Sequence, residues 1–341
     1  MLLTILNKIN YLISNQSLLQ KKYQFGKFEI KLKYPDISYQ VYLEQYYRDL
    51  MTKKFDGVFI HASFNINILK SNPALYSELT TQLPDNTNTS IFIGNNPIHK
   101  FSWVIEYKNK TITLIPHDII PHYILGIIEH VLMYYTKPNY IAIRSACFSY
   151  HNKNFILVGD KFSYKTTILL NILYEGANFL SDDLTFISNK LKITPYLTPL
   201  SVRQDTFSYY PELYNYFEPF FINSTLFPNS TNSVNTFLSL KVNYTEKETS
   251  KIDFIFFLNN KSDNDFSISP IDSQTKNFIY NNCVFREKAN WVKNFFSNEQ
   301  LSDMLKQKSS FIGFILDSIP SYIVNFNAQG IKDFINFIKN T

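Results

Sequence analysis

The stretch Phe155-Ile-Leu-Val-Gly-Asp-Lys-Phe-Ser-Tyr-Lys-Thr-Thr167 has the pattern of an apolar strand, a loop and the start of an amphipathic helix. Gly159, Lys165 and Thr166 occupy three of the four fixed places of the phosphate-binding pattern G-x-x-x-x-G-K-[ST]. In such a loop, backbone N–H groups and the positive end of the helix hold phosphate oxygens, the lysine neutralises them and the hydroxyl reaches Mg²⁺. The sequence therefore predicts a nucleotide-phosphate loop.

The fourth place of the pattern is altered, because Tyr164 stands where the pattern has glycine. A Cβ there crowds the backbone approach that glycine permits, so either the loop follows another path or nucleotide binding is weaker. An unrelated strand, loop and helix with an incidental glycine and Lys-Thr is the alternative interpretation. The candidate cofactor-binding residues are Gly159, Asp160, Lys161, Phe162, Ser163, Tyr164, Lys165, Thr166 and Thr167.

Two adjacent carboxylates follow the helix. Gly176 is placed to end that helix, and the short apolar strand after it leads to Asp182 and Asp183. If this strand runs parallel to the one before the loop, its polar end lies beside the loop. One carboxylate then accepts the proton of the phosphate acceptor and the other binds Mg²⁺, as phosphoryl transfer requires. An exposed Asp-Asp turn is the alternative.

Four segments together resemble the C-terminal domain of the HPr serine kinase family, and most closely its relatives in bacterial peptide-modification and natural-product gene clusters. They are residues 144–159, 165–166, 179–187 and 195–203. The resemblance implies an ATP-dependent, Mg²⁺-requiring kinase with the phosphoenolpyruvate-carboxykinase-like P-loop fold, which transfers phosphate to a hydroxyl, usually of serine. It covers roughly residues 140–205, with a weaker likeness toward the C-terminus.

The resemblance also implies roles for individual residues. Lys165 and Thr166 would bind the phosphates and Mg²⁺. Asp182 would be the catalytic base and Asp183 the metal ligand, and the reverse division stays open. Two further candidates, for stabilising transition-state charge, are Arg203 and Lys241.

Three positions depart from the family pattern. Arg144 stands where the family has a histidine ahead of the loop, and Phe162 and Tyr164 replace loop glycines. Arg144 could hold a phosphate or keep the acidic pair ionised. No signature of the HPr-binding element is present, so the expected acceptor is a hydroxyl of a peptide or small metabolite in a biosynthetic pathway. The alternative is a catalytically impaired pseudokinase that binds a precursor peptide or a partner enzyme.

The order of the patterns along the chain predicts an α/β protein with two parts. Residues 1–90 are expected to form a small α+β module, and residues 91–341 a P-loop domain with a mixed sheet and flanking helices. Strands are predicted at 25–32, 57–64, 90–94, 101–107, 111–115, 142–150, 155–158, 178–180, 184–187, 192–194 and 252–258. Helices are predicted at 1–13, 39–52, 119–135, 166–174, 298–308 and 331–339.

Composition limits the surroundings and partners of the protein. The net charge of +5 is modest and its cations are scattered, which argues against nucleic acid as a partner. No apolar stretch approaches the ~18 residues of a membrane span. Two cysteines, Cys147 and Cys283, are too few for a disulfide framework and suit a reducing compartment, so a cytoplasmic protein is expected.

An aromatic-rich run, Phe207-Ser-Tyr-Tyr-Pro-Glu-Leu-Tyr-Asn-Tyr-Phe-Glu-Pro-Phe-Phe221, follows Arg203 closely. The run favours core packing or a dimer surface, so a homo-oligomer is compatible with the sequence. A peptide-recognition groove beside the active site is the alternative.

Overall fold

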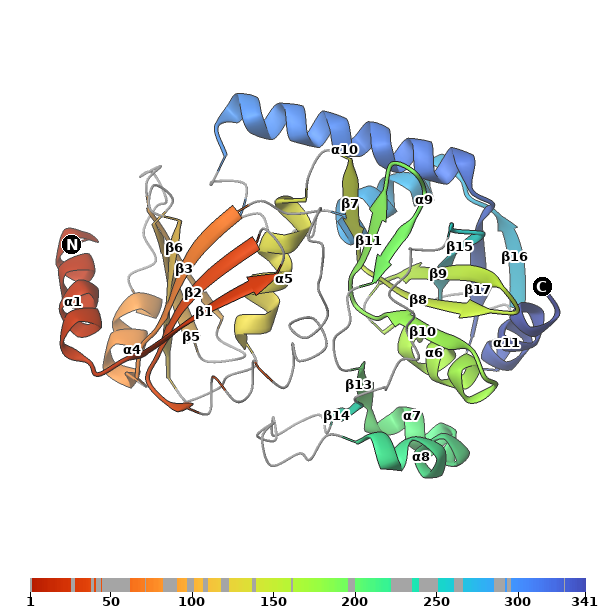
Figure 1. Cartoon of the computed structure of the whole chain (residues 1–341), viewed down its shortest axis with the longest axis horizontal. Helices are drawn as coiled ribbons and strands as arrows, with labels where there is room; N and C mark the ends of the chain where they lie inside the picture. The colour runs from red at the N-terminus through yellow and green to blue at the C-terminus, as the bar shows by residue number, and fades with distance from the viewer. Residues whose placement is uncertain are drawn as a thin grey trace. The chain divides into compact units, whose positions relative to one another are not determined.

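The computed structural model describes the chain in two compact units (Figure 1). One unit comprises Met1–Ile128 with Trp291–Ser297, and the other comprises Glu129–Asn290 with Asn298–Thr341. The residues described are 2–25, 28–37, 40, 44, 62–70, 72–81, 91–96, 101–106, 110–117, 123–136, 139–160, 162–195, 200–221, 235–238, 251–260, 266–284, 292, 296–327 and 329–341.

The first unit contains a six-stranded mixed sheet in the order β1-β2-β3-β6-β5-β4. Its strands are β1 Leu19–Phe25, β2 Phe28–Tyr34, β3 Ala62–Ile68, β4 Ile91–Asn96, β5 Phe101–Glu106 and β6 Thr111–Pro116. Its helices are α1 Leu2–Asn15 and α4 Pro73–Thr81, and α5 Tyr123–Tyr134 follows at the division between the units. Helices α1 and α4 share one buried apolar cluster with β5 and β6, formed by Ile9, Leu69, Leu75, Leu79, Val104 and Ile115.

The structure changes the predicted layout of this unit. Strand β6 pairs in parallel with β3, so the β4–β6 meander completes the same sheet as β1–β3. The boundary predicted at residue 90 therefore falls inside one sheet, and the units divide after Ile128. The predicted hairpin of β5 and β6 is confirmed. The strand predicted at 25–32 is instead parts of two antiparallel strands, β1 and β2. Most of the helix predicted at 39–52 lies outside the described residues.

The second unit is built on a mixed six-stranded sheet in the order β10-β8-β9-β15-β17-β16, accompanied by a three-stranded sheet β12-β11-β7 and the pair β13-β14. Its strands are β7 Tyr140–Ile143, β8 Ser145–Tyr150, β9 Lys153–Gly159, β10 Asn178–Ser181, β11 Thr185–Ser188, β12 Ile193–Pro195, β13 Leu200–Arg203, β14 Asn235–Leu238, β15 Phe254–Asn259, β16 Phe266–Pro270 and β17 Ser321–Phe326. Its helices are α6 Lys165–Tyr174, α7 Gln204–Tyr209, α8 Pro211–Phe217, η1 Glu218–Phe220, α9 Ser273–Phe278, η3 Ile279–Val284, α10 Asn298–Ser318 and α11 Gly330–Asn340.

The centre of this sheet is parallel and covered on both faces. Strands β9, β15 and β17 run in the same direction. In β15, successive side chains point to opposite faces. Phe256 packs against Phe334 of α11, with ring centroids 5.2 Å apart, and Phe257 packs against Phe278 of α9, also at 5.2 Å. Burial on both faces explains why β9 reads as a continuous apolar run instead of an alternating one.

The strand predicted at 142–150 is broken at Arg144. The residues before the break form β7, which pairs with β11, and those after it form β8, which pairs with β9 and β10. Both halves are apolar, so the sequence pattern carries no mark of the change of sheet. Helix α10 also extends ten residues beyond its predicted end at Lys308, to Ser318. These differences concern the bounds of individual elements. The predicted mixed α/β class is confirmed.

Two observations concern the cysteines and the membrane span considered in the sequence analysis. Cys147 and Cys283 are both buried and unbridged. Among the helices that the structure describes, none combines the length and the apolarity that a membrane crossing needs.

Candidate functional site

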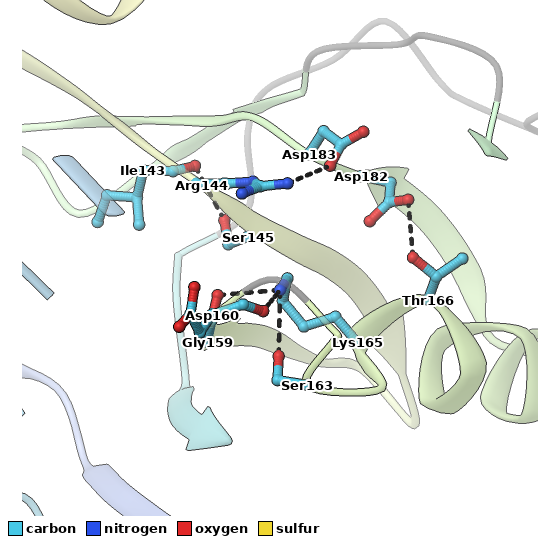
Figure 2. Close-up of polar contacts among 10 residues, drawn as sticks. All are labelled: Ile143, Arg144, Ser145, Gly159, Asp160, Ser163, Lys165, Thr166, Asp182 and Asp183. Atoms are coloured by element: carbon cyan, nitrogen blue, oxygen red, sulfur yellow. Dashed lines mark hydrogen bonds and ion pairs between the residues drawn. The ribbon is translucent and has the colours of Figure 1, made fainter. Parts of the chain in front are cut away.

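The loop between β9 and α6 is closed around the ammonium group of Lys165 (Figure 2). Its Nζ donates hydrogen bonds to the carbonyl oxygens of Gly159 at 2.9 Å and Asp160 at 2.8 Å, and to Ser163 Oγ at 3.1 Å. The side chain is almost fully buried. This burial lowers the pKa of Lys165, the charge of Arg144 lowers it further, and the acids Asp182 and Asp183 oppose the shift. The loop therefore places a desolvated cation at the start of α6.

The two aromatic replacements in the loop keep a backbone conformation that favours glycine. Phe162 has a φ of 68° and Tyr164 a φ of 61°. Asn260 Nδ2 donates to the carbonyl oxygen of Phe162 at 2.9 Å, and the Tyr164 ring lies 6.2 Å from that of Phe326. Left-handed backbone costs roughly 1–2 kcal/mol at a residue with a Cβ, so these neighbours hold the loop in place.

Gly159 is required by close packing at the first place of the pattern. A Cβ on this residue would lie 2.6 Å from Ser163 Oγ and 3.0 Å from the carbonyl oxygen of Leu258. The carbonyl belongs to the neighbouring strand β15 and cannot move away without disturbing the sheet. A side chain here therefore displaces the loop.

We expect Gly159→Ala to lower the free energy of unfolding by about 1–3 kcal/mol, because the added methyl group overpacks the loop. Urea unfolding measures the change. Gly313→Ala in α10 is the matched control, since a Cβ there meets nothing within 4 Å and removes glycine from a helix interior. It should raise stability by about 0.5–1 kcal/mol. Equal effects of the two substitutions would contradict the close packing at Gly159.

The acidic pair lies at the same end of the sheet as the loop. Strand β8 is antiparallel to both β9 and β10, so β9 and β10 run in the same direction and end at the same edge. Asp182 follows β10, and Thr166 Oγ1 in the first turn of α6 donates to its Oδ2 at 3.2 Å. The direction predicted for the acidic strand is confirmed.

Asp182 and Asp183 have different surroundings. Asp182 is 3% exposed. Burial, and next the charge of Asp183, raise its pKa to about 7, against the opposing effect of Lys165. Asp183 has a φ of 64°, and its half-exposed carboxylate lies 3.8 Å from Arg144 Nη2. Asp183 is the central residue of a tight turn, which is closed by a hydrogen bond from Leu184 N–H to the carbonyl oxygen of Asp182 at 2.8 Å.

Arg144 reaches Asp183 from the break between β7 and β8. Its backbone N–H donates to the carbonyl oxygen of Cys283 at 2.8 Å instead of joining either ladder, which accounts for the interruption of the strand. Arg144 therefore lies close to the acidic pair, as one of the two roles considered for it requires. The hydroxyl of Thr166 donates its hydrogen bond to Asp182. The sequence instead groups Thr166 with Asp183 as metal ligands.

The raised pKa of Asp182 predicts a pH-dependent stability. Between about pH 4 and pH 7 the folded state keeps a proton that the unfolded state has released, so stability falls as pH rises through this window. Asp182→Asn stays uncharged and should lack this fall, which makes it the more stable protein at about pH 8 by a few kcal/mol and equal to wild type near pH 4.

Urea unfolding across this pH range measures the effect. Asp303→Asn, an exposed acid of α10, is the control and should follow the wild-type profile. A fall with pH that persists unchanged in Asp182→Asn would contradict the burial of a charge at this position.

Arg203 also lies beside the loop, at the end of β13. Its guanidinium carbon is 4.9 Å from the centre of the Phe162 ring, and its Nη2 pairs with Asp205 Oδ2 at 2.6 Å. Thr167 hydrogen-bonds Thr206 of α7 through their hydroxyl groups, 3.1 Å apart. The sequence contained no sign of the Arg203–Phe162 and Thr167–Thr206 contacts or of Asn260, because these contacts join segments distant in the chain. The other two predicted residues, Lys161 and Lys241, lie outside the described residues.

The side chains that meet at this site offer oxygen donors. Within the described ranges, no group of three or more His, Cys, Asp and Glu side chains is placed to hold a metal ion. Mg²⁺ needs less from the protein, since it is usually held by one or two carboxylates together with substrate phosphates and water. The Thr166 hydroxyl and the Asp182 carboxylate are oxygen donors of that kind, already in contact.

No protein-family model matches the chain, and a search of curated proteins returns no match. The site itself combines a lysine enclosed in a strand-to-helix loop with two acids that follow a second strand of the same direction.

Proposed function

We propose that the protein is an ATP-dependent kinase with a phosphoenolpyruvate-carboxykinase-like P-loop core. It transfers the γ-phosphate to a hydroxyl, usually of serine, in a peptide or small metabolite of a cytosolic biosynthetic pathway. One observation carries the proposal: a short loop joins the buried strand β9 to a helix that begins with Lys165 and Thr166, and the hydroxyl of Thr166 contacts Asp182. A phosphate loop beside an acid is the arrangement that phosphoryl transfer needs.

The geometry supports a division of roles between the two acids. Mg²⁺ would be held by Thr166 and Asp182 and would supply charge neutralisation for the phosphates. Asp183 is accessible to an incoming hydroxyl and is the better placed of the two to accept its proton, which reverses the division first expected. Lys165 would exchange its carbonyl partners for phosphate oxygens, and Arg203 is near enough to the loop to neutralise transferred charge.

A second candidate is a pseudokinase that binds a precursor peptide or a partner enzyme. Its support is Arg144, which stands at the histidine position of the family pattern and lies 3.8 Å from Asp183. The guanidinium occupies one side of the carboxylate that would otherwise accept the hydroxyl proton. The test is Mg-ATP-dependent incorporation of labelled γ-phosphate into serine peptides. Incorporation identifies the kinase, whereas peptide binding without incorporation identifies the binding module.

A further inference from the structure

Helices α6 and α8 and the end of α7 expose four tyrosines, here named the tyrosine surface. They are Tyr174, Tyr209, Tyr214 and Tyr216. Tyr209 is the most exposed, at 73%. The rings of Tyr174 and Tyr216 meet edge to face at 5.0 Å, and that of Tyr214 meets the buried Phe207 at 5.6 Å. These contacts hold the rings of Tyr174, Tyr214 and Tyr216, so these side chains lose little additional freedom when a ligand binds.

The segment that carries most of this surface is acidic. Residues 204–240 contain Asp205, Glu212 and Glu218 and no lysine or arginine, in a chain whose net charge is +5. Asp205 pairs with Arg203. Glu212 and Glu218 are exposed and form no ion pair with any residue that the structure describes. Two carboxylates are thus available to a cationic ligand beside the exposed rings.

The elements that carry the tyrosine surface are connected to the phosphate loop. Tyr174 is the last residue of α6, the helix that begins at Lys165. Thr206 of α7 hydrogen-bonds Thr167 in the first turn of α6, and Arg203, just before α7, stacks on Phe162 of the loop. The start of α7 therefore contacts both the loop and the first turn of α6.

We propose that the tyrosine surface docks a basic segment of the acceptor peptide. Arginine and lysine side chains bind the faces of tyrosine rings and pair with carboxylates, and the two kinds of group lie together here. The remaining part of the peptide then reaches the acidic pair. This inference rests on the proposed kinase function for the identity of the ligand, but the docking itself is measured without ATP.

Fluorescence anisotropy tests the docking with two labelled peptides of equal length. One contains arginine, lysine, serine and glycine, and in the other glutamate replaces every cation. We expect selective binding of the basic peptide that weakens as salt screens the charges. The double substitution Glu212→Lys with Glu218→Lys should weaken binding about tenfold. Tyr209→Ser should weaken it by a similar factor.

Two matched controls separate docking from unspecific effects. Asp303→Lys on α10 alters another exposed acid, and Tyr11→Ser on α1 removes another exposed tyrosine ring, and neither should change the affinity. Equal binding of both peptides, no binding by the folded wild type, or unchanged affinity in the charge-reversed variant would overturn the proposal. So would sedimentation showing that Glu212→Lys with Glu218→Lys dissociates a dimer, because the surface would then belong to a second copy of the chain.

The outcome for docking is independent of the outcome for catalysis. If wild type binds the basic peptide selectively yet never incorporates phosphate, the docking proposal is supported and the kinase proposal is contradicted. If phosphate is incorporated with equal efficiency into both peptides, the kinase proposal is supported and the docking proposal is contradicted.

Discussion

Lys165→Ala is expected to weaken Mg-ATP binding at least about a hundredfold, as measured by isothermal titration calorimetry. The ammonium group lies inside the loop, where burial makes its charge more effective toward a phosphate than a surface lysine could be. A charged hydrogen bond to a ligand is worth about 1.5–3 kcal/mol, and the lysine can offer more than one. A hundredfold loss corresponds to about 2.7 kcal/mol.

Lys190→Ala provides the control, since Lys190 is an exposed lysine in the turn after β11 and should leave the affinity unchanged. The alanine at position 165 also removes three hydrogen bonds within the loop, so the unfolding transition of each variant must be recorded in the absence of nucleotide. In wild type, Mg-ATP at a hundred times its dissociation constant should add about 2.7 kcal/mol of stability. If Lys165→Ala is folded and gives the wild-type isotherm, the proposal that this loop binds the phosphates of ATP is contradicted.

Asp183→Asn is expected to reduce phosphate incorporation by a factor of about 10²–10⁴ while Mg-ATP still binds. Asparagine keeps the size of the side chain but cannot accept the hydroxyl proton. Asp182→Asn should instead lose both incorporation and the Mg²⁺ dependence of nucleotide binding, because Asp182 contacts the hydroxyl of Thr166. Transfer of labelled γ-phosphate and calorimetry with and without Mg²⁺ distinguish the two variants.

Arg144→Gln is informative beside them, because it removes the ion pair with Asp183. If that pair suppresses the base, Arg144→Gln should incorporate phosphate faster than wild type. Full activity in Asp183→Asn would exclude this acid as the base. Loss of Mg²⁺-dependent binding in Asp183→Asn alone would restore the division of roles in which Asp183 is the metal ligand.

The loop and its flanking elements could be predicted from the sequence because their signals are local. An apolar run before Gly159 and a helical pattern after Lys165 predict β9 and α6 within two residues of their observed ends. Strand β10 runs in the same direction as β9, which meets the condition set for the acidic pair, and β8 lies between the two strands in the sheet. In these elements, local propensity and the final packing favour the same structure.

Other features depend on contacts that a single sequence does not encode locally. The change of sheet at Arg144 is set by the carbonyl oxygen of Cys283, more than a hundred residues later. The extent of the first unit depends on the parallel pairing of β6 with β3, which are separated in the chain by α4, β4 and β5. Which acid faces Thr166 depends on the φ of Asp183, a backbone angle with no residue signature when glycine is absent.

The left-handed backbone at Phe162 and Tyr164 has a consequence for attempts to transplant this loop. A glycine-bearing loop carries its own conformational freedom and can be grafted onto another strand and helix. Here the loop conformation also depends on contacts with Asn260 and Phe326, which belong to other parts of the chain. A chimera that receives residues 159–167 alone would inherit the bulky side chains without their supports. The smallest exchangeable module therefore includes the ends of β15 and β17.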